Sequence, residues 1–371
     1  MTDEQTRLER LAELSVKVAA NVQPGQRVVV GGELAHAPLM HEIARAAYKA
    51  GAREVNPFYI DRHFTRAAVE LGPEESLGET PPWNLVLLQT LAQEEGAYIF
   101  VSGSPEPHLM ADLPGELVGK ALPLKFFAEV SQITSDRKVN WALVPGPNVG
   151  WAQEMFGKPD TEALWQAVEK ALRLDREDPV AAWREHVDRL HGVAAVLSDR
   201  RFDALRYRGP GTDLTVGLLP SSRWQGGTIE TAFGVTHVPN LPTEEVFTSP
   251  DKRRAEGHIR STMPLQWFGT MVRDLELEFR DGQIVNVKAS EGADVIRGDI
   301  ARDANANRLG ELALVDGSSE VGRLGITFYN TLFDENATSH IAYGNGFAFC
   351  IEDEKDREAG LNASSAHTDF M

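Results

Sequence analysis

The chain has 371 residues, of which 42% are hydrophobic and 25% are charged, a composition typical of a soluble globular protein. Its net charge of −18 argues against nucleic acid or an anionic membrane surface as the main partner, and its single cysteine, Cys350, excludes an internal disulfide and a zinc site built on several thiolates. The length predicts two domains, and an N-terminus without a signal-like apolar segment predicts a cytoplasmic protein.

Segments typical of helices and of strands alternate in the first half of the chain. The expected helices cover about residues 3–20, 37–52, 83–97 and 116–132, and the expected strands cover about residues 25–32, 53–61, 98–103 and 139–147. Strands that are separated by helices of this length predict a parallel sheet with crossover helices. The first strand ends in Gly31 and Gly32, but the chain has no G-x-G-x-x-G or G-K-[ST] motif there, so we expect a tight turn from strand to helix rather than a nucleotide site.

The second half of the chain has a different character. A mostly helical stretch over residues 160–192 is expected to connect two domains, with the boundary near residue 195. The clearest hairpin is residues 271–290, where apolar residues alternate with polar ones on both sides of an Asp281-Gly282 turn. One helix is expected within residues 291–308. The predicted fold class is therefore α/β, with an N-terminal parallel-sheet α/β domain and a strand-rich α+β C-terminal domain.

Four residues near the C-terminus have the chemistry of metal ligands. His367 and Asp369 are two apart, so in a strand their side chains project to the same side. Glu335 and His340 are five apart, which matches neither a helix face nor a strand face. They converge only if residues 336–339 form a turn, which their Asn, Thr and Ser favour. The flanking segments "ITFYNTLF" and "IAYG" are typical of strands.

Two further carboxylates lie in apolar or turn-rich surroundings. Glu245 precedes Val-Phe in a short segment bounded by prolines, and Glu311 lies inside "RLGELALV". A glutamate within a buried strand is costly unless it is paired or bound to a cation. The alternative for Glu311 is an ion pair with Arg308 or Arg323, or a solvent-facing position at the start of the strand. Four carboxylates and two imidazoles without sulfur are a suitable ligand set for two divalent ions.

Four segments together identify a family. In this order, "PNLPTEEVFTSPD", "RLGELALV", "FYNTLFDENATSHIAYGNG" and "AHTDFM" resemble the thermophilic aminopeptidase family of metallopeptidases, the aminopeptidase T and aminopeptidase S group. The resemblance extends to "GPGTDLTVGL" and "VQPGQRVVV", and so covers essentially the whole chain.

The resemblance implies a cytoplasmic aminopeptidase that acts on peptide substrates with two divalent metal ions per chain. It implies a homodimer, with residues 1–195 forming the N-terminal domain for substrate access and dimer contacts and residues 196–371 forming the catalytic domain. The native metal is left open among Zn, Co, Mn and Mg. Matched motif by motif, the implied metal ligands are Glu245, Glu311, Glu335, His340, His367 and Asp369.

The sequence departs from the family pattern at two places. The family usually has a tyrosine that is thought to assist catalysis seven residues after the histidine of the "FDEN…H" motif, and this chain has Phe347 there. Phenylalanine has no hydroxyl to donate to a developing oxyanion, and the nearest tyrosine that would take its place is Tyr343. The family also continues for some tens of residues past the final His-x-Asp, whereas this sequence ends at Met371, so the edge of the site is expected to differ or the tail to be missing.

The expected reaction is hydrolysis of the N-terminal peptide bond by a water molecule that two metal ions activate. A carboxylate in the pocket accepts the proton and passes it to the leaving amine. Glu311 and Glu335 are the candidates for bridging the ions and for this catalytic role, and the sequence does not decide between them. Two alternatives remain open: a peptidase-like protein weakened by Phe347 that binds metal or peptide, and a two-metal phosphoesterase, which the absence of a basic cluster near the motifs disfavours.

Overall fold

A computed structural model describes residues 3–267 and 270–371. The chain forms two compact units: the first consists of Met1–Arg184 with Thr228–Pro242, and the second of Glu185–Gly227 with Thr243–Met371. The expected boundary near residue 195 lies inside the long helix α9, which spans Pro179–Arg200. Residues 228–242 follow that expected boundary in the sequence, but they belong to the first unit.

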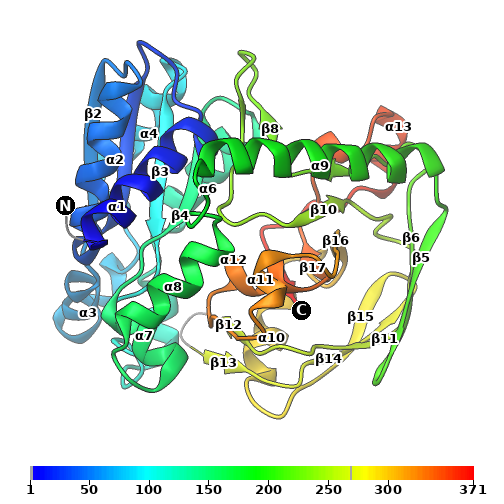
Figure 1. Ribbon diagram of the computed structural model, residues 1–371. Coiled ribbons are helices and arrows are strands. Elements are labelled where there is room, and N and C mark those ends of the chain that lie inside the picture. Colours follow the sequence, from blue (N-terminus) through cyan, green and yellow to red (C-terminus); the bar gives the residue numbers. More distant parts are fainter. Residues whose placement is uncertain (1–2, 268–269) are drawn as a thin grey trace. The chain divides into compact units, whose positions relative to one another are not determined.

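The first unit is built on a four-stranded parallel sheet in the order β2-β1-β3-β4 (Figure 1). This confirms the parallel sheet predicted from the alternation of helices and strands. The strands are β1 (Arg27–Glu33), β2 (Glu54–Ile60), β3 (Ala97–Ser102) and β4 (Asn140–Pro145). The β1 strand is buried at its five central positions, as expected for a Val-rich strand covered on both faces.

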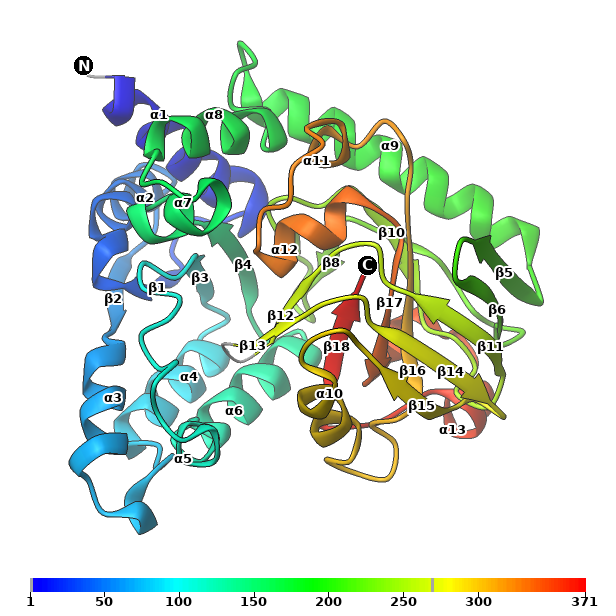
Figure 2. The ribbon, with the colours of Figure 1, turned by 90° about the horizontal axis from the view of Figure 1, so that it is seen from below.

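Helices cover both faces of this sheet. Figure 2 shows α2 on one side of the sheet and α4 with α6 on the other. The helices are α1 (Asp3–Leu14), α2 (Ala37–Lys49), α3 (Arg62–Leu71), α4 (Pro82–Gln93), α5 (Gly115–Lys120), α6 (Leu124–Ser135), α7 (Val149–Phe156) and α8 (Thr161–Ala171). The unit also contains a short hairpin of β8 (Ile229–Glu230) and β9 (Thr236–His237).

The single helix expected over residues 116–132 is wrong, because the structure has two helices there, α5 and α6. Pro123 lies between them. It has no N–H to donate and its ring clashes with a preceding helical turn, so the first helix ends and a second begins. The carbonyl of Pro123 then accepts the N–H of Phe126 at 2.9 Å, which helps to start α6.

The second unit contains two five-stranded antiparallel sheets, as the strand-rich prediction for this half requires. One has the order β18-β17-β16-β10-β7 and the other β15-β14-β11-β6-β5. The strands of the first sheet are β7 (Gln225–Gly226), β10 (Glu245–Thr248), β16 (Leu309–Val315), β17 (His340–Gly344) and β18 (His367–Phe370). The strands of the second sheet are β5 (Ala204–Gly209), β6 (Thr212–Gly217), β11 (Ala255–Arg260), β14 (Glu276–Arg280) and β15 (Gln283–Lys288).

The remaining elements of this unit are short. They are β12 (Leu265–Trp267), β13 (Thr270–Val272), α10 (Ala293–Ile300), α11 (Glu320–Arg323), α12 (Thr331–Asp334) and α13 (Glu354–Gly360). The predicted hairpin is confirmed as β14 and β15, joined by Asp281 and Gly282, both of which have positive φ. The expected helix within residues 291–308 is present as α10 and is shorter than the segment that predicted it.

One continuous cluster of buried side chains joins the two sheets of the second unit. It includes Leu214 of β6 and Phe279 of β14 from one sheet, and Leu312 of β16 and Ile341 of β17 from the other. The first sheet therefore turns one face toward the hydrophobic core. Because side chains alternate along a strand, every second residue of β10, β16, β17 and β18 lies on its other face. Among the described residues, no helix is both long and apolar enough to cross a membrane.

Candidate metal centre

The face of the first sheet that points away from the core collects the predicted ligands. Cross-strand pairing places Glu311 of β16 opposite Ala342 of β17, and Ala342 opposite Asp369 of β18. Residues that pair directly across strands share a face. Ala342 leaves space between the two carboxylates, because its side chain is only a methyl group.

On the same face, the cross-strand pairs on either side of Glu311, Ala342 and Asp369 also place a ligand opposite a small residue. Ala313 of β16 pairs with His340 of β17, and His367 of β18 pairs with Gly344. Glu245 begins β10, the strand on the other side of β16. Four strands thus supply five of the six predicted ligands, and small residues separate them. His367 and Asp369 point to the same side, as their spacing of two predicts.

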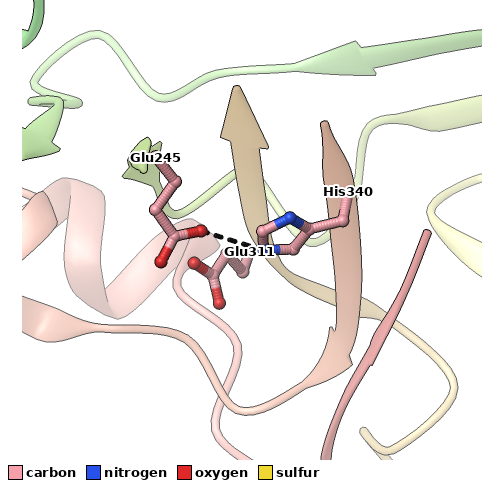
Figure 3. A group of neighbouring side chains, drawn as sticks. All are labelled: Glu245, Glu311 and His340. Atoms are coloured by element: carbon pink, nitrogen blue, oxygen red, sulfur yellow. Dashed lines mark ion pairs between the residues drawn. The ribbon is translucent and has the colours of Figure 1, made fainter. Parts of the chain in front are cut away.

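The side chains come close enough to share ions. One ligand atom each from Glu245, Glu311 and His340 lie within 4.8 Å of one another, and so do ligand atoms from Glu311, His367 and Asp369. Figure 3 shows the first of these groups, with Nε2 of His340 3.0 Å from Oε2 of Glu245. Glu311 belongs to both groups, so the two lie side by side and have one carboxylate in common.

The second group is held by its histidine. Nε2 of His367 lies 3.2 Å from Oε2 of Glu311 and 3.7 Å from Oδ1 of Asp369. Its Nδ1 donates to the carbonyl of Asn345 at 2.9 Å, just as Nδ1 of His340 donates to the carbonyl of Thr338 at 3.2 Å. A carbonyl only accepts, so each Nδ1 carries a proton and each Nε2 faces the carboxylates. Histidine ligands of metal ions are commonly oriented in this way.

The electrostatics of the cluster are those of a site that needs cations. Burial, with the charges of Asp369 and Glu245, raises the pKa of Glu311 to about 7 even though His367 acts in the opposite direction. Burial alone would lower the pKa of His340, but the neighbouring carboxylates, above all Glu245, outweigh it and raise that pKa well above its usual value. Three carboxylates gathered in one buried place repel one another unless protons or metal ions balance them. The donor set, its spacing and its charge fit divalent ions.

The sixth predicted ligand, Glu335, lies beside the cluster and belongs to neither group. Its side chain is buried, and burial with the charges of Asp369 and Glu245 raises its pKa well above the usual range. It follows α12 on a short 3-10 turn, Glu335–Ala337. The structure therefore brings all six residues into one place and distinguishes Glu335 from the other five.

A buried asparagine that the sequence did not single out fixes two of these carboxylates relative to each other. Oδ1 of Asn336 accepts the backbone N–H of Glu244 at 2.6 Å, and its Nδ2 donates to the carbonyl of Leu332 at 2.8 Å. Asn336 follows Glu335 and Glu244 precedes Glu245. This hydrogen bond therefore ties together the two segments that carry these carboxylates, which are far apart in sequence.

The strand expected for "ITFYNTLF" is wrong, since the segment forms a loop and then helix α12. The carboxylate of Asp334 causes the turn. It accepts the N–H of Phe328 at 2.7 Å and of Asn330 at 3.1 Å, which bends the chain back on itself. This compact loop, together with the 3-10 turn after it, brings Glu335 and His340 together.

Tyr343 cannot replace the missing family tyrosine, contrary to expectation. It is fully buried on the core face of β17, and its hydroxyl donates to Oδ2 of Asp299 at 2.9 Å. The same oxygen accepts from Thr368 at 2.8 Å. Asp299 thereby links α10 to β17 and to β18, behind the ligands. The alternative ion pair of Glu311 with Arg308 or Arg323 is wrong, because Glu311 pairs with His367. Arg308 instead donates to the carbonyl of Lys252.

The phenylalanine at the position of the family tyrosine does lie at the site. The ring of Phe347 is 5.2 Å from the ring of His367, measured between centroids. Its backbone N–H donates to Oγ of Ser249 at 2.8 Å, directly after β10. The site therefore has an aromatic ring without a hydroxyl beside one of its histidines.

Comparison with known proteins places this arrangement in a family. The sequence profile described as "Thermophilic metalloprotease (M29)" matches residues 4–371. The chain is 40% identical to aminopeptidase T of Thermus thermophilus, with 98% of this chain and 91% of that protein covered. It is 38% identical to aminopeptidase 2 of Geobacillus stearothermophilus and 36% identical to aminopeptidase AmpS of Bacillus subtilis, again over 98% of this chain and over 91% and 92% of those proteins.

A solved structure gives the same result. The structure described as wild-type AmpT from Thermus thermophilus matches with a TM-score of 0.91 and 37% sequence identity, and the match covers 98% of this chain and 92% of that one. This confirms the predicted mixed α/β fold class and the predicted family resemblance. The chain belongs to the thermophilic metalloprotease family M29.

Proposed function

We propose that the protein is a metal-dependent aminopeptidase that removes N-terminal residues from peptides at the cluster on β10, β16, β17 and β18. Membership of a metallopeptidase family and relatives that are named aminopeptidases confirm the expected enzyme class, a metallo-aminopeptidase. Neither of the two alternatives, a weakened binding protein or a phosphoesterase, finds support among these relatives. The observation that carries the proposal is the pair of ligand groups that share Glu311.

The proposed ligand assignment follows these two groups. Glu245, Glu311 and His340 would hold one divalent ion, and Glu311, His367 and Asp369 the other, with Glu311 as the bridging carboxylate. The set has nitrogen and oxygen donors and no sulfur, which suits Zn, Co, Mn or Mg. Bound there, the two ions would supply a Lewis acid for the scissile carbonyl and would lower the pKa of a water molecule.

Glu335 is then the proposed proton carrier. It is the one predicted carboxylate of the site that lies outside both ligand groups, while its charge interacts with those of Asp369, Glu245 and Glu311. Burial and the neighbouring carboxylates raise the pKa of Glu335 well above its usual range, and a carboxylate with a raised pKa is a better acceptor for a proton from water, which it then returns to the leaving amine. The carboxylates of the cluster also offer a partner for the positively charged α-amino group of the substrate, which explains cleavage from the N-terminal end.

Removal of metal tests this proposal. Dialysis against a chelator is expected to reduce hydrolysis of leucyl p-nitroanilide to background, because the carboxylates and imidazoles do not activate water without ions. Addition of zinc, cobalt, manganese or magnesium is expected to restore it, and elemental analysis should find two ions per chain in the active form. Circular dichroism before and after dialysis controls for unfolding. Full activity in protein without detectable metal would refute the proposal.

We further propose a homodimer in the cytoplasm, in which the N-terminal domain provides substrate access and dimer contacts and the C-terminal domain provides catalysis. The buried Cys350, which is a free thiol, fits a reducing compartment. Exposed apolar side chains on the first unit, among them Trp83 at 72% and Leu124 at 63% exposure, offer a surface for subunit contacts. Light scattering, which would give twice the 40.8 kDa mass of one chain for a dimer, measures the oligomeric state.

A further inference from the structure

Three phenylalanine side chains form a cluster at the edge of the candidate metal centre. They are Phe247 on β10, and Phe347 and Phe349 in the segment after β17. The centroid of Phe347 lies 5.4 Å from that of Phe247 and 5.4 Å from that of Phe349, and the rings of Phe247 and Phe349 are 6.2 Å apart. We call these three residues the aromatic wall.

The aromatic wall is joined to the ligand groups at two points. The ring of Phe347 lies 5.2 Å from the ring of His367. Phe247 is two residues after Glu245 on the same strand, so its side chain lies on the face that carries the ligands. In the row of that face between Phe247 and His340 stands Ala313, whose small side chain leaves the surface above it open.

The aromatic wall packs on buried residues on one side and is partly exposed to solvent on the other. Its three rings pack on a buried base formed by Leu219, Cys350 and Ile351. All three phenylalanines nevertheless keep part of their surface exposed, although aromatic side chains of this size normally gain by complete burial. A preformed, partly exposed apolar surface beside polar groups with reactive chemistry is the usual form of a substrate subsite.

The chemistry of the substrate decides what this surface binds. In an N-terminal residue, the same α-carbon carries the free amino group, the scissile carbonyl and the side chain. If the amino group and the carbonyl are held at the carboxylates and imidazoles, then the side chain must lie within a few ångströms of them. The aromatic wall lies at that distance from His367.

We propose that the aromatic wall receives the side chain of the substrate's N-terminal residue, so that peptides beginning with an aliphatic or aromatic residue are preferred. This inference rests on the proposed function. The three rings offer no hydrogen-bonding group, so a lysine or glutamate side chain placed against them would lose hydration without compensation. One additional methylene in a hydrophobic pocket raises kcat/KM by roughly 10-fold or more, and the leucine side chain has three more carbons than that of alanine, so leucine is favoured over alanine by well over roughly 10-fold.

Variants of Phe349 test the inference, because this residue belongs to the aromatic wall without contacting His367 in the described geometry. The measurement is kcat/KM for p-nitroanilides of Leu, Phe, Ala, Lys and Glu, which differ only in the N-terminal residue. The native enzyme is expected to favour Leu and Phe. In Phe349→Ala the ratio of Leu to Ala is expected to fall by roughly 10-fold, and in Phe349→Leu, which keeps an apolar side chain, it should be largely retained.

Two further variants serve as a control and as a replacement for Phe349→Ala. Phe202→Ala is a matched control, since Phe202 is a 41% exposed phenylalanine of the same unit that is not part of the aromatic wall, and its specificity ratios should match those of the native enzyme. Phe247→Ala provides a second variant if Phe349→Ala fails to fold. Metal content and melting temperature are recorded for each variant, so that loss of ions or of structure is separated from loss of specificity.

The outcomes distinguish this inference from the proposed function. Hydrolysis of every anilide at similar rates, or a preference for Lys or Glu, would overturn the aromatic wall as the subsite while leaving the aminopeptidase intact. A second series, dipeptides X-Ala and Ala-X, also decides: if Phe349→Ala alters only the Ala-X ratios, the wall binds the second residue and the inference is wrong. Absence of hydrolysis of all substrates by the metal-loaded enzyme would instead refute the proposed function itself.

Discussion

Replacing Glu311 with alanine is expected to abolish hydrolysis of leucyl p-nitroanilide, with a loss of about a thousandfold or more, and to reduce the number of bound ions per chain. Glu311 supplies a ligand atom to both groups, so its removal affects both ions at once. It also removes the ion-pair partner that holds Nε2 of His367 at 3.2 Å. Elemental analysis and isothermal titration with zinc or cobalt measure the loss of metal.

The fold should tolerate this change. Glu311 is a buried carboxylate whose pKa burial raises to about 7, so its charged form does not favour the folded chain in the absence of ions. The metal-free variant is therefore expected to melt at a temperature close to that of the metal-free native protein. Glu358→Ala, which removes an exposed carboxylate of α13, is a suitable control and should retain both ions. Retention of two ions and of activity by Glu311→Ala would contradict the shared-ligand assignment.

The sequence predicts best those parts of the site that depend on one strand. His367 and Asp369 are two apart, and β18 places both on the ligand face, because the alternation of a strand is a local property. Glu311 was identified as a carboxylate inside an apolar strand, and the structure confirms that strand as β16. In both cases neighbouring residues alone determine which way the side chain points.

The parts that the sequence could not predict depend on contacts between distant segments. Glu335 reaches the cluster because Asp334 turns the preceding loop through two backbone hydrogen bonds, and because Asn336 binds the backbone of Glu244. Neither contact has a periodic pattern, so the residues of "ITFYNTLF" predict a strand although the segment forms a loop and then α12. Tyr343 is a different case, because strand alternation alone excludes it: its odd spacing from His340 places it on the opposite face of β17, where Asp299 binds its hydroxyl.

The same division applies to the fold. The alternation of helices and strands predicted the parallel sheet, and Asp281-Gly282 predicted the hairpin, since each depends on local preferences. The partition into units was harder to predict. Residues 228–242 join the first unit although they follow the expected boundary near residue 195. Only tertiary packing determines to which core such a segment belongs.

Replacing Glu335 with glutamine is expected to separate proton transfer from metal binding. Glutamine has nearly the same shape as glutamate but does not accept a proton at neutral pH, so kcat should fall by about 10²–10⁴-fold. Glu335 lies outside both ligand groups, so the variant should still bind two ions. Because the charge of Glu335 interacts with those of Asp369, Glu245 and Glu311, its removal should weaken metal affinity, but by less than the removal of a ligand does.

Comparison with Glu245→Gln shows whether Glu335 is a metal ligand or a proton carrier. Glu245 belongs to a ligand group and pairs with His340 at 3.0 Å, so its glutamine variant should lose metal affinity together with activity. Elemental analysis and kcat are measured for both variants at saturating metal. If Glu335→Gln loses an ion as Glu245→Gln does, then Glu335 is a ligand and another group carries the proton. If Glu335→Gln keeps native activity, then Glu335 has neither role, and the raised pKa of this buried side chain reflects its place in the cluster rather than catalysis.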